Sequence, residues 1–322
     1  MTRPKRALLN IGMRKFCLKG IFLIAAAATL SASALCANPA DDGRSPHRLG
    51  NQIYVSYDTP WNVSVKQGVR FYPECPDPEV KLDLYYPNEK CKEPKPYPCI
   101  LVVHGGGWSM GNEKKFGLMA SYLASRGYVV ASTTYRLRPK YSMEDCAYDV
   151  KKSLFWLKKH AAEFGGDPKR VGVVGGSAGG HLTALLAVSA NAPKWREIFT
   201  DGIDDSVQAA VPMAPITNLD TFSSWGLFPG GNERDRSKEL SPMTYVSEKS
   251  APMLILHSKN DPLVPLSESQ NIKAAYEKYG AKCDMIVYDS GDHAFWNLRA
   301  YNPLQLRSWN DAANFFDKTL KK

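Results

Sequence analysis

Residues 171–181 read Val-Gly-Val-Val-Gly-Gly-Ser-Ala-Gly-Gly-His, and this stretch decides the fold. Residues 170–174 have the apolar, β-branched composition of a buried strand, and 178–189 continue with a helical pattern. Between them, Ser177 stands at the centre of Gly-x-Ser-x-Gly. A sharp turn from a strand into a helix crowds the backbone, so the positions around the serine require glycine. The pattern predicts a serine hydroxyl raised above the sheet, at the positive end of the following helix.

Apolar runs and helical patterns alternate on both sides of this turn. Continuous apolar runs separated by helices favour an α/β fold with a mostly parallel, doubly wound sheet covered by helices on both faces. We expect the first strands to be antiparallel. The predicted strands are 80–86, 98–103, 128–132, 170–174, 207–212, 253–257 and 284–288. The predicted helices are 115–126, 142–164, 178–189, 267–279 and 304–318.

Two further segments have a recognisable local pattern. The helix 142–164 should begin with a capping box made by Ser142 and Asp145, and Gly165 follows its end. Residues 216–251 interrupt the alternation and are rich in Ser, Gly, Pro and aromatic residues. We expect them to form a short insertion over the strand ends, above the active site.

A second glycine-rich motif, His-Gly-Gly-Gly-Trp at 104–108, directly follows the apolar run 98–103. Three glycines allow backbone N–H groups to face inward without interference from side chains. Together with the N–H of Ala178, such groups would hold the negative oxygen of a tetrahedral intermediate. His104 stands at a strand end, so we expect it to fix the loop by hydrogen bonds and not to act in catalysis.

Two later loops carry a carboxylate and a histidine. Asp261 follows the run 253–257 in a loop fixed by prolines, and His293 follows the run 284–288. A histidine can take the proton of Ser177 and return it to a leaving group, while a carboxylate sets its tautomer and stabilises the imidazolium. Asp292 is a rival for the acid, but a side chain adjacent to His293 in sequence tends to point away from it. This reasoning favours Asp261.

The composition is that of an ordinary globular protein. The 322 residues carry a formal net charge of +9, but the first 34 residues hold six Lys or Arg and no acidic residue. Without them, 35 basic residues face 32 acidic ones. This nearly balanced charge gives no reason to expect a nucleic acid as a partner. No linker separates two folded bodies, so we expect one catalytic domain at 63–322.

Residues 1–34 have the pattern of a secretory signal peptide. A basic stretch precedes an apolar core at 21–30, and small residues follow at 32–34. The core is shorter than the about 20 apolar residues that span a bilayer, although an uncleaved membrane anchor is the alternative. We expect a secreted or periplasmic bacterial protein that meets the membrane only transiently, with an N-terminal extension at 35–62. Met13 is an alternative start.

The cysteines leave one question open. Cys75 and Cys91 flank a single strand-and-turn segment, and an exported protein could join them in a disulfide. No spacing of cysteines and histidines is typical of a metal site.

With these motifs in this order, the chain resembles the α/β-hydrolase superfamily over about 80–318. The branch it resembles holds secreted esterases similar to hormone-sensitive lipase, and bacterial acetyl-xylan and feruloyl esterases most of all. The resemblance implies compact acyl groups, while the short insertion and the lack of a long N-terminal helical cap argue against lipid-like substrates. The implied catalytic triad is Ser177, Asp261 and His293. The implied oxyanion hole is formed by Gly106, Gly107 and Ala178.

The leading hypothesis is the hydrolysis of short-chain carboxylic esters through an acyl-enzyme, without a cofactor. Export points to acetyl or feruloyl esters on plant polysaccharide. An arylformamidase-like amide hydrolase and a general short-chain carboxylesterase or lipase are the enzymatic alternatives. A non-enzymatic binding protein would require a missing triad position, and none is missing. The candidates for contact with substrate, each of which could instead pack the insertion onto the core, are Trp108, Trp225 and Trp296, with Phe222 and Phe228 beside them.

Overall fold

The computed structural model describes residues 47–49, 52–54, 59–227, 233–297 and 303–321. A small antiparallel sheet pairs β1 (His47–Leu49) with β2 (Gln52–Tyr54). The predicted signal peptide at 1–34 lies outside the described residues, so the domain boundaries at 34 and 62 stay predictions. Among the helices that the structure describes, none is both long and apolar enough to cross a membrane.

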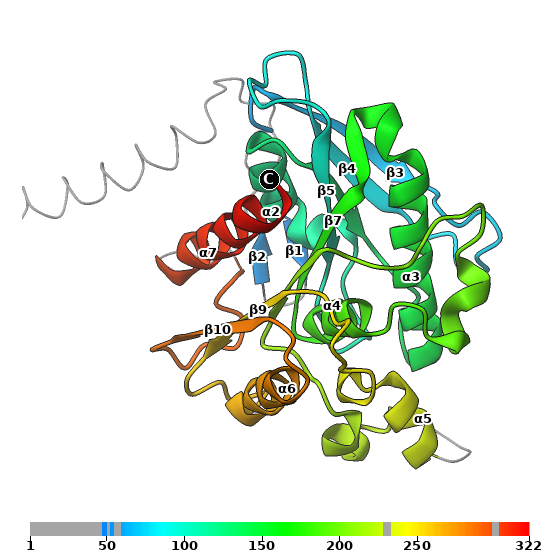
Figure 1. Ribbon diagram of the computed structural model, residues 1–322, viewed down its shortest axis with the longest axis vertical. Coiled ribbons are helices and arrows are strands. Elements are labelled where there is room, and N and C mark those ends of the chain that lie inside the picture. The colour runs from blue at the N-terminus through cyan, green and yellow to red at the C-terminus, as the bar shows by residue number, and fades with distance from the viewer. Residues whose placement is uncertain (1–46, 50–51, 55–58, 228–232, 298–302, 322) are drawn as a thin grey trace, which may run out of the picture.

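The main sheet in the described part of the chain has eight strands in the order β10-β9-β8-β7-β5-β6-β4-β3 (Figure 1). The six neighbouring strands β10, β9, β8, β7, β5 and β6 pair in parallel. At the other side of the sheet, β4 pairs antiparallel with both β3 and β6. This confirms a mostly parallel sheet with antiparallel first strands. The strands are β3 (Val63–Val69), β4 (Leu82–Pro87), β5 (Tyr97–Val103), β6 (Val129–Thr133), β7 (Gly166–Gly176), β8 (Ala209–Met213), β9 (Met253–Ser258) and β10 (Cys283–Tyr288).

Helices cover both faces of this sheet, as the predicted doubly wound α/β architecture requires. Buried side chains of α3, α4 and α6 pack on one face, and those of α2 and α7 pack on the other (Figure 1). The α-helices are α2 (Gly117–Ser125), α3 (Met143–His160), α4 (Ala178–Val188), α5 (Glu233–Leu240), α6 (Leu266–Lys278) and α7 (Pro303–Leu320). Short 3₁₀ turns are η1 (Glu113–Phe116), η2 (Ala161–Phe164), η3 (Pro193–Ile198), η4 (Leu219–Trp225) and η5 (Pro242–Thr244).

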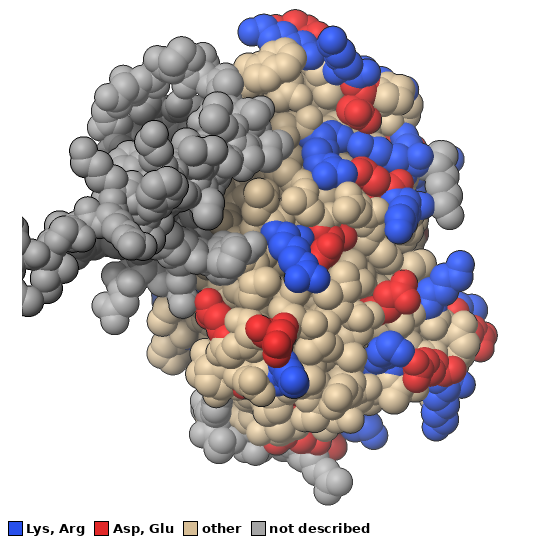
Figure 2. Space-filling model, turned by 90° about the vertical axis from the view of Figure 1, so that its left-hand side faces the viewer, with Lys and Arg blue, Asp and Glu red and all other residues tan. Residues whose placement is uncertain are grey.

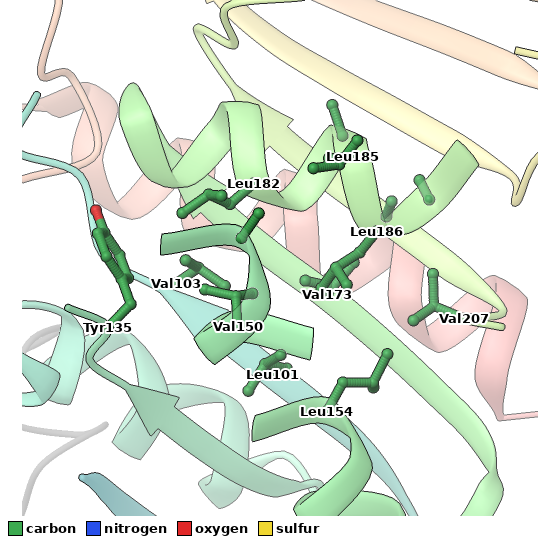
Figure 3. Close-up of a cluster of buried hydrophobic side chains, with 14 of the residues drawn as sticks. Leu101, Val103, Tyr135, Val150, Leu154, Val173, Leu182, Leu185, Leu186 and Val207 are labelled. Carbon is green, nitrogen blue, oxygen red and sulfur yellow. The ribbon is translucent and has the colours of Figure 1, made fainter. Parts of the chain in front are cut away.

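The central strands are apolar throughout because each of their faces is covered. On β5, Leu101 and Val103 point into the cluster beneath α3 and α4, where Figure 3 shows them beside Val173 and Leu182. Val102, the residue between them, belongs to the opposite cluster, as does Ile100 on their other side. Fully burying one such aliphatic side chain stabilises the fold by about 1.5–3 kcal/mol. The core is therefore built symmetrically about the strands that carry the glycine motifs.

The predicted ends of α3 are present. Ser142 Oγ accepts the N–H of Asp145 at 3.1 Å, and the Asp145 carboxylate accepts the N–H of Ser142 at 2.9 Å, which completes the capping box. Gly165 follows η2 with a φ of +74°, in the left-handed region, and its N–H donates to Ala162 O. The helix is thereby turned back into β7.

Two strands differ from the sequence-based expectation. The alternating pattern at 80–86 predicts a half-buried strand, yet β4 lies inside the sheet and packs on both faces, with Leu82 and Leu84 in one core cluster and Tyr85 in the other. Asp83 is consequently only 1% exposed, and it accepts the N–H of Gly68 at 2.8 Å. In contrast, β10 stands at the edge of the sheet, and Val287 is 41% exposed. Position in the sheet, and not the strand's own pattern, decides both outcomes.

The insertion at 216–251 contains η4, α5 and η5, and it is anchored at several points. The Glu268 carboxylate on α6 accepts the N–H groups of Thr217 and Asn218 at 2.7 and 3.0 Å. Arg236 on α5 pairs with Glu144 on α3 at 2.9 Å. These contacts fix the insertion at the carboxyl side of β8.

The visible surface carries charges of both signs, and the two cysteines of the suggested disulfide are not joined. On the face that Figure 2 shows, Lys and Arg alternate with Asp and Glu, as the nearly balanced charge of the chain predicts. Cys75 and Cys91 are free thiols. The suggested disulfide between them is therefore not formed in this structure.

Candidate active site

Ser177 occupies the turn between β7 and α4 in a conformation that residues with side chains rarely adopt. Its φ is +59° and its ψ is −122°. Two backbone hydrogen bonds hold this conformation, since its N–H donates to Met213 O at 2.8 Å and its carbonyl accepts the N–H of His181 at 2.9 Å. The turn places the hydroxyl directly before the first residue of α4, as the sequence predicts.

Three side chains form a continuous hydrogen-bonded chain at the carboxyl edge of the sheet. His293 Nε2 lies 2.9 Å from Ser177 Oγ, and His293 Nδ1 lies 2.6 Å from Asp261 Oδ2. Because a carboxylate accepts hydrogen bonds, Nδ1 carries the proton and Nε2 can accept one from the serine. The structure thus brings Ser177, His293 and Asp261 together from loops far apart in the sequence.

The Asp261 carboxylate is completely buried but well supplied with donors. Its Oδ1 accepts the N–H groups of Leu263 and Val264 at 2.8 and 2.9 Å. Burial raises the pKa of Asp261, but the hydrogen bonds from His293, Val264 and Leu263 outweigh that effect, so the pKa lies below its ordinary value. Asp261 is therefore ionised at neutral pH and can stabilise a positive charge on His293.

Asp292, the rival acid, serves its own loop. Its Oδ1 accepts the N–H of Ala294 at 2.9 Å, which is a local turn hydrogen bond. Ser258 at the end of β9 donates to the Asp292 carbonyl at 2.7 Å, so this loop is tied to the neighbouring strand. The geometry favours Asp261 as the partner of His293.

His257 is a buried residue at this site that the sequence gave no reason to single out. Its Nε2 donates to Val264 O at 3.0 Å, and its Nδ1 accepts from Ser269 Oγ at 2.6 Å. Burial lowers the pKa of His257, which keeps the ring neutral. The ring thereby holds the loop that carries Asp261 against β9 and α6.

The glycine loop at 104–107 lies against the serine turn. A Cβ placed on Gly105 would lie 2.3 Å from Gly176 O and 3.2 Å from Ser177 Cβ, so no side chain fits there. Gly106 has a φ of +134°, and its carbonyl accepts the N–H groups of Ser109 and Met110, both at 3.1 Å. The loop is thus folded tightly beside the start of α4, where the N–H of Ala178 has no acceptor four residues earlier in the helix.

His104 fixes this loop, as expected. It is buried, its Nδ1 donates to Gly105 O at 3.0 Å, and its Nε2 accepts from Thr134 Oγ1 at 3.2 Å. Its ring stacks on Tyr135 with the centroids 4.4 Å apart. Burial lowers the pKa of His104 to about 3, so the ring is neutral.

Trp108 is fully buried in this structure, which corrects the expectation that its side chain contacts the substrate. Its side chain has no exposed surface, and its indole N–H donates to His181 Nδ1 at 3.2 Å. His181 Nε2 donates in turn to Leu240 O at the end of α5, at 2.9 Å. Trp108 is buried because it joins the glycine loop to α4 and, through His181, to the insertion.

The other candidate aromatics differ in their placement. Trp296 is 2% exposed and packs edge-on against the His293 ring, with the ring centroids 5.4 Å apart. It therefore supports the histidine from inside the protein and offers no exposed surface to a substrate. Phe222 is also buried. Trp225 belongs to η4, but its side chain is outside the described residues, and Phe228 lies wholly outside them.

Two exposed apolar side chains that the sequence did not single out come from the loops of the site. Met110 follows the glycine loop and is 63% exposed, and its Cγ would lie 2.8 Å from a Cβ on Gly106. Leu263 is 56% exposed and follows Asp261 by two residues.

Comparisons with known proteins find a family model and several esterases that this chain resembles. The family model BD-FAE matches residues 82–276, more than half of the chain. The probable carboxylic ester hydrolase LipM of Mycobacterium tuberculosis is 33% identical over 187 residues, 54% of this chain and 43% of that protein. Esterase LipQ of the same organism is 31% identical, over 57% of this chain and 47% of that protein. The chain spans about half the length of the curated relatives it matches.

Solved structures extend the likeness over more of the chain. A thermophilic esterase of Thermogutta terrifontis in its propionate-bound form is 29% identical, with a TM-score of 0.65 over 80% of this chain and 94% of that one. A truncated carbohydrate esterase from gut microbiota has a TM-score of 0.69 over 80% of this chain and 97% of that one. Its identity of 22% makes this a likeness of fold alone. The chain belongs to the BD-FAE family and has the α/β-hydrolase fold of the esterases it resembles.

Proposed function

We propose that this protein is a serine esterase that hydrolyses carboxylic esters of short acyl groups. The observation that carries the proposal is the hydrogen-bonded chain from Asp261 through His293 to Ser177, beside a tightly folded glycine loop. The esterase relatives support the same reaction class.

In the proposed mechanism, His293 Nε2 removes the hydroxyl proton as Ser177 Oγ attacks the ester carbonyl. The resulting tetrahedral intermediate collapses, the ester C–O bond breaks, and the imidazolium gives its proton to the departing alcohol. Water then attacks the acyl-enzyme, again with His293 as the base, and the collapse of the second intermediate releases the acid and restores Ser177. Asp261 stays ionised and stabilises the imidazolium in both halves.

The negative oxygen of each intermediate needs hydrogen-bond donors, and we assign this role to the N–H groups of Gly106, Gly107 and Ala178. The close approach of the glycine loop to the serine turn supports the assignment. Removing one such donor typically costs about 2.7–4 kcal/mol of transition-state stabilisation.

For the substrate, we propose short acyl groups such as acetyl, and also feruloyl, on plant polysaccharide, reached by export of the protein. The Thermogutta terrifontis esterase has been solved with propionate and with butyrate, which supports a compact acyl group. Met110, which follows the glycine loop, and Leu263, which follows Asp261, are exposed apolar side chains in the loops of the site. The short insertion supports an open site that a sugar chain can enter.

The proposal is tested with a substrate panel and an active-site label. Nitrophenyl acetate, acetylated xylan, methyl ferulate and an N-formyl arylamine are compared by kcat/KM, and paraoxon is used to phosphorylate the reactive hydroxyl. We expect hydrolysis of the esters, little turnover of the amide, and one phosphoryl group per chain on Ser177. Preferred turnover of the formyl amide would favour the arylformamidase alternative. A label on another residue would remove Ser177 from the mechanism.

A further inference from the structure

Lys115 makes an unusual contact with the glycine loop. It lies in η1, is partly buried, and its ammonium Nζ donates to Gly105 O at 3.0 Å. The same carbonyl oxygen accepts the Nδ1–H of His104, also at 3.0 Å. One carbonyl oxygen thus receives two donors, and one of them is a cation.

The position of this carbonyl gives the contact its significance. The carbonyl of Gly105 and the N–H of Gly106 belong to one peptide unit, whose resonance couples the oxygen to the nitrogen. A donor on the oxygen draws electron density away from the nitrogen, and this makes the N–H a stronger donor. Gly106 is one of the residues whose N–H groups are assigned to the oxyanion.

We propose that Lys115 is a positioning residue that, in its charged form, polarises the Gly105–Gly106 peptide and so strengthens the Gly106 N–H that binds the oxyanion. The proposal rests on the proposed function, since it requires an oxyanion at this place. It goes beyond the triad because it gives a role to a charge on a separate element.

The surroundings of Lys115 fit a charge that is balanced only during the reaction. Among the described residues, none forms a carboxylate ion pair with it, and burial lowers the pKa of Lys115 from its ordinary value. His104 faces it from the loop after β5 and is neutral, as is Tyr135 stacked behind that ring. Glu113 in the same turn interacts electrostatically with Lys81 and Lys114. A developing oxyanion would supply the missing negative charge.

Three substitutions separate charge from hydrogen bonding. Lys115→Met removes both, Lys115→Gln keeps an N–H donor without charge, and Lys115→Arg keeps the charge. With nitrophenyl acetate, we expect kcat to fall about tenfold or more for Met and less for Gln, with KM little changed, because only the transition state carries the oxyanion. Lys115→Arg should keep most of the wild-type kcat. Lys114→Met, which removes an exposed charge one residue away, is the matched control and should leave kcat unchanged.

The pH profile gives a readout that a purely structural role would not move. In the wild type, kcat should fall on the alkaline side as Lys115 loses its proton. This alkaline limb should shift to higher pH in Lys115→Arg, because a guanidinium stays protonated, and it should vanish in Lys115→Gln. Phenylboronic acid, which forms a tetrahedral adduct with an active serine, should bind more weakly to Lys115→Met by about the same factor as the loss in kcat.

The outcomes distinguish this inference from the proposed function. If Ser177→Ala abolishes turnover while folded Lys115→Met keeps the wild-type kcat and affinity for phenylboronic acid, the polarising role is wrong and the esterase proposal stands. An unchanged alkaline limb in both Lys115→Arg and Lys115→Gln would also overturn the role. If Ser177→Ala stays active, the proposed function itself fails. Thermal unfolding of each variant checks that it is folded.

Discussion

At the scale of single residues, the Asp261 carboxylate determines what His293 can do. It is buried, ionised and bonded to the imidazole at 2.6 Å, so it fixes the tautomer that leaves Nε2 free to accept a proton. Asp292 bonds instead to the backbone of its own loop. The two carboxylates therefore serve different purposes.

This difference predicts unequal effects of two matched substitutions. Asp261→Asn should lower kcat on nitrophenyl acetate by roughly 10⁴-fold, because the amide favours the wrong tautomer of His293. Asp292→Asn should lower it by less than about tenfold, since it weakens a local turn hydrogen bond and leaves the bond between His293 and Asp261 in place. Greater damage from Asp292→Asn would move the acid role to that residue.

Among the structural elements, the glycine loop, α4 and the end of α5 are joined through one imidazole. His181 accepts from Trp108 and donates to Leu240 O, and both ring nitrogens are therefore used inside the core. His181→Phe keeps the ring but removes both hydrogen bonds. Each buried group left without a partner costs about 1–3 kcal/mol.

We therefore expect His181→Phe to lower the free energy of unfolding by about 2–5 kcal/mol and to expose 233–240 to limited proteolysis. Tyr288→Phe, which also removes one hydrogen bond of a buried side chain but joins β10 to Asp311 on α7, is the control. It should lower stability less and leave α5 protected. Equal proteolysis of both variants would show that His181 does not hold the insertion.

The elements also show what the sequence can and cannot predict. Ser177, Asp261 and His293 each follow an apolar run, and the carboxyl ends of parallel strands meet at one edge, so their proximity was predictable. The burial of Trp108 was not, because its partner His181 lies 73 residues away. The contact of Lys115 with Gly105 depends on η1, a turn that precedes α2 where the pattern predicted one continuous helix.

At the scale of the whole molecule, two buried neutral histidines link stability to pH. Burial lowers the pKa of His181 from 6.5 to about 4 and that of His104 to about 3. The unfolded chain binds protons to both rings at a higher pH than the folded chain. Their contribution to stability is therefore complete above pH 6.5 and is lost as the pH falls toward 4 and 3.

We expect the free energy of unfolding to fall by roughly 6 kcal/mol between about pH 6.5 and 4, since each unit of pKa difference corresponds to about 1.4 kcal/mol for each of the two rings. Urea unfolding at several pH values measures this slope. In His181→Phe, the slope of the free energy of unfolding against pH should be smaller by the amount that the uptake of about one proton contributes. An unaltered slope in that variant would show that His181 does not titrate with unfolding.

The whole site also predicts a dependence on acyl length. A long apolar channel would gain about 0.8 kcal/mol for each buried methylene, whereas the open site that we propose would bury about one or two. Over nitrophenyl acetate to nitrophenyl palmitate, kcat/KM should peak at acetyl to butyryl and fall beyond about six carbons. A maximum at about ten carbons or longer would indicate a lipase.

The central claim is that Ser177 is the nucleophile of an ester hydrolase, and Ser177→Ala tests it most directly. Only one small hydroxyl is lost, so the variant should keep the wild-type circular dichroism and unfolding midpoint. Its kcat/KM for nitrophenyl acetate should fall by roughly 10⁴-fold or more, because the triad acts as a unit and nothing replaces the attacking oxygen. A folded Ser177→Ala variant that retained more than about one-hundredth of the wild-type value would contradict the claim.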